Sequence, residues 1–465
     1  MNTTFKELYT KESKLFIGLY IFFIFGAAMG DYKVLNAALG ALPKAISAGA
    51  IGIAALYILY TGNFKNFKAL SRFSLLFASF IIGIILYSII IWIIDLQSFS
   101  YILKGVSKIS YQLLNIAIVF SAVYMFEEKA AKYTFFGIAA ANFVIIAIGA
   151  ATTGIGGAIT DLIANITSFG SNDVIGNSAF IRAIEIHDIT FTMGVFFIYF
   201  LFFDPGEKYR YLYAGIALFL FFTGFKRIAF LSLFLGIAFA LAMKLISAKK
   251  QRRVLMFTAF LVVVFCYVYL ITIQNGSFTR LLTEHGIELN GREKIYDYIA
   301  NYYEVKPTYL GKGYEFCVQL LKSMHGTKEQ VVNITAVHND ILKMYVEMGF
   351  WGFLFWILTY YAYQTHWYIS RCGEKVAVCF MTISLYMLIT YMTDNTMFYY
   401  WSSMVIRIIP MAVFFDPVKE APLRRTNRLQ MNSFQRWRYN LRERDKKERI
   451  KPRMKAPSNE NDLVL

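Results

Sequence analysis

The chain alternates between long apolar runs and short charged connections along most of its length. A helix needs about 20 mostly apolar residues to cross the hydrocarbon core of a bilayer. Such runs predict twelve membrane spans, at residues 15–30, 45–61, 73–94, 108–126, 133–151, 187–204, 210–224, 228–247, 253–273, 350–369, 376–393 and 399–415. Because a spanning helix satisfies its backbone hydrogen bonds internally, the pattern predicts an all-α polytopic membrane protein.

The first apolar run resembles a signal peptide because it follows Lys6, Lys11 and Lys14. A cleaved signal would be followed by a small-residue cleavage pattern and a soluble mature chain. Neither follows here, so this run is interpreted as a retained first span.

One long polar segment interrupts the apolar pattern between the ninth and tenth spans. The chain is therefore divided into a first bundle (1–273), a long loop (274–349), three further spans (350–415) and a tail (416–465). The loop holds most of the groups able to do chemistry, and we expect the other segments to act as its scaffold.

The distribution of Lys and Arg predicts the orientation of the spans, because cytoplasmic connections carry an excess of both. An even number of spans puts both termini on one side. If the termini are inside, the cytoplasmic connections carry more cations than the outer connections do. These cytoplasmic cations are Lys65, Lys68, Arg72, Lys129, Lys132, Lys208, Arg210, Lys249, Lys250, Arg252, Arg253, Arg371 and Lys375. Both termini are therefore predicted to be cytoplasmic and the loop at 274–349 extracytoplasmic.

Composition supports this class and argues against nucleic-acid binding. The chain is 57% hydrophobic and only 17% charged, and its net charge is +17. Between residues 419 and 455, 14 Lys and Arg stand against 4 Asp and Glu, so about +10 lies in the tail. Such a tail is typical of a cytoplasmic anchor on anionic lipid. Phe434, Trp437 and Leu441 recur there at helical spacing, which fits an amphipathic surface helix, with disorder as the alternative.

Three cations are candidates for an anion site on the outer face. Lys226 and Arg227 lie in a tight turn between two spans, and Arg292 lies in the loop. Guanidinium groups bind phosphate with two parallel hydrogen bonds, and a lipid pyrophosphate would be their natural ligand. The alternative is that the turn residues are interface anchors and Arg292 pairs with a nearby acid.

His338, Asn339 and Asp340 precede a helical run and are the second group of candidates. An imidazole can act as a base, an acid or a phosphate donor near neutral pH, whereas a lone histidine is often only a packing residue. Asn339 or Asp340 alternatively caps the helix. Glu185 and His187, with Asp188, are candidates for sugar recognition or for a plain helix cap.

The remaining polar residues are given structural interpretations. Arg407 lies inside the last span, where it would bind substrate, or pair with Asp394 or a helix carbonyl. His285 and His325 are expected to be solvated and His366 interfacial. The four cysteines show neither metal spacing nor a disulfide pattern, and no Gly-rich phosphate loop follows a strand, so we expect no metal and no cofactor.

In their order along the chain, these motifs resemble the bacterial O-antigen ligase and O-antigen or exopolysaccharide polymerase superfamily. The resemblance is carried by the turn at 223–227, Arg292 with Tyr296, the Gly311-Lys312-Gly313 motif, His338-Asn339-Asp340 and the run at 347–352. Two positions depart from the family pattern. Lys226 stands where the family often has Ser, and Tyr296 where it often has Trp.

The resemblance implies a metal-independent glycosyltransferase of the multi-span type C fold, in a bacterial inner membrane. Its donor would be a polyprenyl-pyrophosphate-linked oligosaccharide. Arg227 and Arg292 would stabilise the pyrophosphate, and His338 would act as base on the acceptor hydroxyl or contact phosphate. Lys226, Tyr296, Glu185, His187, Asn339 and Arg407 are the predicted substrate-binding residues.

Three functions remain open on these grounds. A polymerase, which we favour, would extend a lipid-linked repeat unit, and a chain-length regulator is compatible with it as a partner. A ligase would transfer the glycan to a lipid core or a protein. A flippase or transporter of lipid-linked oligosaccharide is disfavoured, because such proteins usually show internal repeats and broken helices at the midplane.

Overall fold

The computed structural model describes residues 2–39, 45–61, 66–167, 178–184, 186–204, 206–224, 226–285, 291–324 and 336–415. Glu185, His325 and the tail from residue 416 therefore lie outside the described residues, and the interpretations given to them stay predictions. The described residues form helices and their connections, without a strand.

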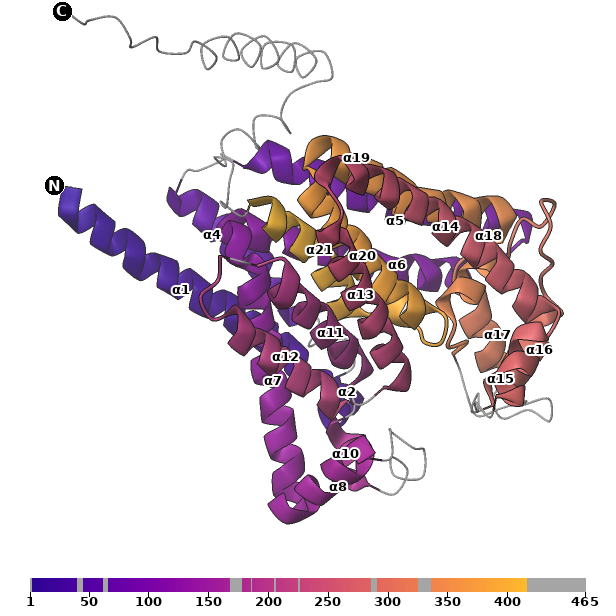
Figure 1. The fold of residues 1–465 in the computed structure, drawn as a ribbon, viewed down its shortest axis with the longest axis horizontal. Coiled ribbons are helices and arrows are strands. Elements are labelled where there is room, and N and C mark those ends of the chain that lie inside the picture. Colours follow the sequence, from indigo (N-terminus) through magenta and orange to yellow (C-terminus); the bar gives the residue numbers. More distant parts are fainter. Residues whose placement is uncertain are drawn as a thin grey trace, which may run out of the picture. The chain divides into compact units, whose positions relative to one another are not determined.

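Every predicted span corresponds to a helix (Figure 1). The helices that carry spans are α1 (Asn2–Met29), α4 (Gly49–Thr61), α5 (Phe67–Ile94), α6 (Phe99–Phe126), α7 (Ala130–Thr153), α11 (His187–Phe202), α12 (Arg210–Thr223), α13 (Arg227–Leu245), α14 (Ala248–Gln274), α18 (Asp340–Ile357) with η2 (Leu358–Tyr363) and α19 (Gln364–Arg371), α20 (Glu374–Tyr391) and α21 (Tyr400–Phe415). Among the described helical segments, six are long and apolar enough to cross a membrane, and six shorter ones are also apolar. The predicted all-α polytopic membrane fold is confirmed.

Shorter elements lie between these helices. They are α2 (Lys33–Leu39), η1 (Glu127–Lys129), α8 (Ile155–Thr167), α10 (Ala179–Ile184), α15 (Ser277–Glu284), α16 (Arg292–Ala300), α17 (Phe316–Met324) and η3 (Thr396–Phe398). In its described residues, the segment predicted as one long loop thus contains three short helices, α15, α16 and α17, which Figure 1 shows grouped beyond the end of α14.

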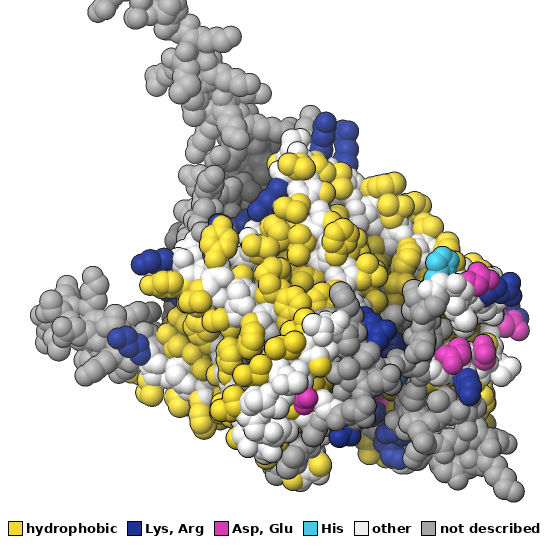
Figure 2. Space-filling model, turned by 60° about the horizontal axis from the view of Figure 1, so that its bottom comes forward, with side chains coloured by type: hydrophobic (Ala, Val, Ile, Leu, Met, Phe, Trp, Pro, Cys, Tyr) yellow, Lys and Arg dark blue, Asp and Glu magenta, His cyan; other side chains and the backbone are white. Residues whose placement is uncertain are grey.

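Large apolar side chains cover much of the visible surface, whereas most visible acidic side chains gather at one end (Figure 2). Leu75 on α5, Phe234 on α13 and Phe260 on α14 are among the exposed residues. In water such a surface would be costly, but facing lipid it is not. The interior holds fully buried aromatic residues, including Trp92, Trp356 and Trp401.

Helix α18 is broken at Gly349, which has φ +66° and ψ −174°. The backbone of Gly311 passes so close that a Cβ on Gly311 would lie 2.5 Å from the Gly349 nitrogen. The Gly313 amide donates to the Glu347 carbonyl at 2.8 Å, and the Phe350 amide donates to the Tyr309 carbonyl at 2.9 Å. The glycines of both motifs therefore permit a backbone-to-backbone contact that fixes the first turns of α18.

Candidate functional site

His338 lies just before α18, and its side chain contacts Asp394 in the connection between α20 and η3. The distance from His338 Nδ1 to Asp394 Oδ1 is 3.4 Å. His338 adopts the left-handed conformation with φ +51°, which is uncommon outside glycine. Such strain is found preferentially where the surrounding structure must hold a side chain in a functional orientation.

Asp394 is 4% exposed and stands between two histidines. His187, the first residue of α11, places its Nδ1 3.8 Å from Asp394 Oδ2. The backbone amide of Asn395 and the Tyr399 hydroxyl donate to Asp394 Oδ1 at 2.8 and 3.2 Å, respectively. Burial favours the neutral acid, but the His338 hydrogen bond and the charges of both imidazoles outweigh it and lower the pKa of Asp394 to about 2. We call His187, His338 and Asp394 the His–Asp cluster.

Arg292 and Tyr296 lie at the beginning of α16, within electrostatic range of one another. Gly291 precedes the helix with φ +80°, and Arg292 is the first helical residue, half-buried. Tyr296 follows one turn later with its hydroxyl buried, which raises the pKa of that hydroxyl. The charges of Arg292 and Asp394 both act on the Tyr296 hydroxyl, as does the Asn339 side chain. Tyr296 is therefore within electrostatic range of both Arg292 and Asp394.

Asn339 has a structural role in this arrangement. Its side-chain oxygen accepts from the Leu342 amide at 3.0 Å, so Asn339, rather than Asp340, is the N-cap of α18. Its amide nitrogen donates to the Tyr269 hydroxyl at 2.9 Å, and that hydroxyl donates to the Met392 carbonyl at the same distance. Asn339 and Tyr269 thus join α14, α18 and the end of α20 directly behind the His–Asp cluster.

The turn with Lys226 and Arg227 lies at the same end of the bundle as His187. A Cβ on Gly224 would meet Thr190, one turn into α11, with its carbon atoms at 2.9 and 3.1 Å. This close approach requires glycine and puts the turn against the first turn of α11. Lys226 is half-buried and Arg227, which begins α13, is exposed. That Arg227 and Arg292 converge on one ligand stays a prediction.

The His–Asp cluster borders a cleft of about 1130 Å³. His187 lines this cleft, and so does Asn395, whose side-chain nitrogen Nδ2 lies 3.5 Å from His338 Nδ1. Aromatic rings make up much of the wall, namely Tyr111, Tyr314, Phe398, Tyr399 and Tyr400. A typical small-molecule site has a volume of about 300–1,000 Å³, so this cleft is large enough for a ligand bigger than a single small metabolite.

Charged side chains form another wall of the cleft. Glu315 pairs with Lys108 of α6 and with Lys343 of α18, whose Nζ lies 3.4 Å from Glu315 Oε1. Burial favours the neutral Glu315, but Lys343 and Lys108 outweigh it and hold its pKa below the usual value. Glu347 accepts from the Cys317 amide at 3.2 Å and interacts electrostatically with Lys343. We call Lys108, Glu315, Lys343 and Glu347 the lysine network.

Two other predicted residues have partners away from the His–Asp cluster. Asp188 accepts from the amides of Trp401 and Ser402, both at 2.9 Å, and so caps α21 rather than its own helix. Arg407 donates to Asn115 Oδ1 at 2.6 Å and to Gln112 Oε1 at 2.8 Å. Of the alternatives considered for Arg407, the pairing with Asp394 is wrong, because Arg407 bonds to Asn115 and Gln112 and Asp394 contacts the two histidines.

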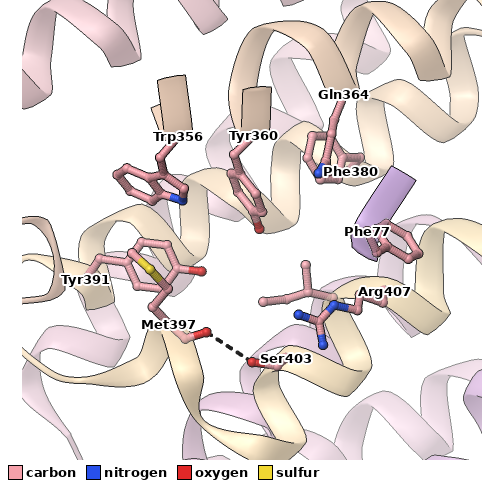
Figure 3. A pocket seen from close by; sticks show the side chains of 10 residues that line it. Phe77, Trp356, Tyr360, Gln364, Phe380, Tyr391, Met397, Ser403 and Arg407 are labelled. Carbon is pink, nitrogen blue, oxygen red and sulfur yellow. Dashed lines mark hydrogen bonds between the residues drawn. The ribbon is translucent and has the colours of Figure 1, made fainter. Parts of the chain in front are cut away.

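Arg407 lines a separate cavity of about 40 Å³ within the bundle. Figure 3 shows its guanidinium directed into a ring of side chains that includes Tyr360, Tyr391 and Ser403. This volume admits a water molecule or two but no sugar. Gln112 lines the large cleft and also accepts from Arg407, so Arg407 reaches the cleft through Gln112.

The smaller predictions can be compared with the structure as well. The four cysteines are free and buried, as expected. His285 is exposed, with its ring nitrogen 2.8 Å from the Leu281 carbonyl, and His366 is also exposed.

Asp394 is the functional candidate that sequence reasoning missed, since it was considered only as a partner of Arg407. Its signal is the polar run Thr393-Asp394-Asn395 between two apolar spans on the predicted outer side. The spacing of 56 residues between His338 and Asp394 gives no hint of contact, because only tertiary packing brings them together.

Comparison with known proteins adds one finding. Residues 212–357 match the family model described as O-antigen ligase, while no curated protein matches the chain. The matched segment runs from α12 to α18 and contains Arg227, Arg292 and His338, whereas His187 and Asp394 lie outside it. Such a match indicates a membrane glycosyltransferase of the O-antigen ligase and polymerase type. The predicted resemblance is confirmed, and residues 212–357 of this multi-span protein are similar to the O-antigen ligase family.

Proposed function

We propose that the protein is a polysaccharide polymerase at the outer face of a bacterial cytoplasmic membrane. It transfers glycan from a polyprenyl-pyrophosphate carrier onto the terminal sugar of a lipid-linked repeat unit. The observation that carries this proposal is the contact of His338 with the buried, ionised Asp394 at the edge of the large cleft.

His338 acts as the general base in this proposal. When its Nδ1–H donates to Asp394 Oδ1, Nε2 is left with a free lone pair. The acceptor hydroxyl gives its proton to Nε2 while its oxygen attacks the anomeric carbon of the donor sugar. Asp394 then stabilises the imidazolium that forms, as a carboxylate does in related dyads.

The arginines stabilise the leaving group. As the new glycosidic bond forms, the bond between the anomeric carbon and the phosphate oxygen breaks, and its electron pair stays on the pyrophosphate. Arg292 and Arg227 compensate this charge, with Lys226 as an additional cation. Pyrophosphate is a weak base, so its departure requires charge stabilisation more than protonation. Tyr296, His187 and Asn339 position these groups, Glu185 remains a predicted sugar ligand, and Arg407 would act on the cleft only through Gln112.

The ligase alternative keeps the same chemistry and changes the acceptor. The family description favours retaining it, since that description is O-antigen ligase. The two functions differ in whether the acceptor is another lipid-linked repeat unit or a lipid core or protein.

Purified protein in nanodiscs, given lipid-pyrophosphate oligosaccharide as the only substrate, tests the proposal. A polymerase produces a ladder of longer glycans, whereas a ligase produces none until a second acceptor is added. His338→Ala, Arg292→Ala and Arg227→Ala should each lower the rate by about 10²-fold or more. Two substitutions at exposed positions serve as controls, His285→Ala and Arg280→Ala. If all three site variants retain wild-type rates and product lengths, the proposed site is wrong.

The proposed orientation has its own test, because the native cysteines are all buried and give little background labelling. A cysteine in place of the exposed Lys306 should react with an impermeant maleimide on intact cells. Labelling only after lysis would place the loop on the cytoplasmic side and remove the basis for an outer-face reaction.

A further inference from the structure

Arg407 is a cation in the middle of the last span, and its hydrogen-bond partners are neutral. It is the eighth of the 16 residues of α21, and its guanidinium donates to the side-chain oxygens of Asn115 and Gln112. Within the described part of the chain, no Asp or Glu forms an ion pair with it. A charge at this depth is costly and normally has a counter-charge inside the bundle.

The groups that act on Arg407 electrostatically do not supply this counter-charge. They are the hydroxyls of Tyr360, Tyr368 and Tyr391, which are uncharged near neutral pH. A negative charge beside Arg407 would therefore have to come from a ligand.

The guanidinium faces a space that can hold such a ligand. Arg407 is the one residue of α21 that is not buried, although the residues on both sides of it are. It lines the cavity of about 40 Å³, and Figure 3 shows its guanidinium directed into that space. The accessible part of the Arg407 side chain is therefore its cavity-facing surface.

The cavity wall is rich in hydrogen-bond donors. The Trp356 indole and the Gln364 amide line it, and neither side chain forms a hydrogen bond with another described residue. The hydroxyls of Tyr360 and Tyr391 are directed toward the same space (Figure 3). The Ser403 hydroxyl is already used, since it donates to a backbone carbonyl at 3.0 Å. Guanidinium and indole groups can only donate, so a ligand in this cavity has to accept.

We propose that this cavity binds a small monovalent anion, for which chloride is the model ligand, with Arg407 as its counter-ion. A water molecule needs about 10–15 Å³ of such volume, and chloride is only slightly larger than water. Phosphate, sulfate and carboxylic acids contain several heavy atoms and would not fit. The site is separate from the His–Asp cluster and does not depend on the proposed function.

Water alone fits the cavity less well than an anion does. A water molecule would accept from the N–H groups, but its own two protons would need acceptors, which the wall supplies sparsely. It would also leave the guanidinium without a counter-charge, whereas an anion accepts from several donors at once and neutralises Arg407.

The anion would stabilise one wall of the large cleft from behind. Because the side-chain oxygens of Gln112 and Asn115 accept from Arg407, their amide nitrogens point the other way. They donate to the carbonyls of Phe398 and Tyr400 at 3.3 and 2.9 Å. Phe398 and Tyr400 both line the cleft, so an ion that holds Arg407 in place also holds these two residues.

Thermal unfolding in two salts provides the test. Protein purified throughout in sodium gluconate, whose anion is too large for the cavity, is transferred to sodium chloride at the same ionic strength. We expect Tm to rise with chloride and to saturate, by about 2–3 °C at a hundredfold excess over Kd, and bromide to act in the same way. An equal Tm in gluconate and chloride would overturn the proposal.

Variants assign the effect to the cavity. Arg407→Gln should abolish the chloride-dependent shift, whereas Arg280→Gln, at an exposed position, should retain it. If Arg407→Gln does not fold, Tyr360→Phe removes a single hydroxyl from the wall and should raise Kd for chloride about threefold or more. Tyr363→Phe, at an exposed position of the same segment, is its control. Wild-type chloride titrations in Arg407→Gln or Tyr360→Phe would place the ion elsewhere and overturn the proposal.

Crystals of the wild-type protein grown in sodium bromide locate the ion directly, because bromide scatters anomalously. We expect an anomalous peak in contact with the Arg407 guanidinium. A cavity without such a peak, filled by water alone, would contradict the proposal. Glycan transfer is not measured in any of these experiments, so their outcome is independent of the proposed function.

Discussion

The His–Asp cluster and the lysine network both border the large cleft, and both depend on the first turns of α18. They differ in exposure. The His338 and His187 side chains are 27% and 34% exposed, whereas Lys343 and Glu315 are 9% and 5% exposed and Lys108 alone in the network, at 48%, reaches the surface. They also differ in charge, since one carboxylate faces two imidazoles in the cluster, while in the network two carboxylates face two ammonium groups.

The difference in exposure and charge favours different roles for the two neighbouring sets of polar residues, one in the reaction and the other in holding the structure. An accessible imidazole changes its protonation near neutral pH and can exchange a proton with a substrate. A buried ammonium paired with a carboxylate keeps its charge and mainly fixes the elements that carry it. In the proposed function the His–Asp cluster therefore carries the reaction, and the lysine network holds the shape of the cleft wall.

The largest effect is expected where both groups lose their common support, at Gly349. A Cβ there would overlap the backbone of Leu310 and Gly311, and the positive φ disfavours any L side chain. Gly349→Ala should destabilise the protein on the order of 5 kcal/mol and abolish transfer. Thermal unfolding in detergent measures the first effect and the glycan ladder the second.

Gly352→Ala is the matched control, because its Cβ would meet only side chains, of Met348 and Tyr87, at 3.0 Å or more. If Gly349→Ala melts and transfers like Gly352→Ala, the contact between the two glycine motifs does not hold α18 in place.

The lysine network should affect stability more than chemistry. Lys343→Met leaves Glu315 with Lys108 alone and Glu347 without a nearby cation. Removing one partner of a buried pair typically costs about 3–5 kcal/mol. Thermal unfolding should show this loss, and the double variant Lys343→Met with Glu347→Gln should recover part of it, because it removes the uncompensated charge. Strictly additive destabilisation in the double variant would contradict the proposed electrostatic coupling.

Asp394→Asn tests the role proposed for the His–Asp cluster. An amide keeps the shape of Asp394 but cannot stabilise an imidazolium, so the transfer rate should fall about 10–100-fold. A purely structural role of Asp394 would lower stability without lowering kcat.

Asp394 also contributes to stability with a defined sign. Its pKa of about 2 in the folded protein lies below the ordinary 3.8, so the ionised form stabilises the fold at neutral pH. This contribution is lost as the pH falls from about 4 to 2. Wild type and Asp394→Asn should therefore differ in stability at neutral pH and converge in strong acid.

The sequence predicted the fold well because lipid imposes length and polarity on every span. The motifs that contain Gly311 and Gly349 were noticed only because they carry the family resemblance. Their contact with each other could not be predicted, because a close approach of two backbones leaves no local pattern in the sequence. Asp188 was considered for sugar recognition or as a helix cap, and Arg407 for substrate binding or for pairing within the bundle. Their partners, the first amides of α21 and the side chains of Gln112 and Asn115, are distant in sequence and follow only from helix packing.

The smallest effect is expected at Tyr269, which supports the His–Asp cluster from behind. Tyr269→Phe removes the acceptor for Asn339 and the donor to the Met392 carbonyl, and should cost about 1–2 kcal/mol of stability. Because Asn339 caps α18 directly after His338, the substitution should also lower kcat severalfold with little change in KM. Tyr363→Phe, at an exposed position, is the control. If Tyr269→Phe lowers stability but leaves kcat unchanged, the Asn339–Tyr269 contact supports the bundle only, and the orientation of His338 depends on Asp394 alone.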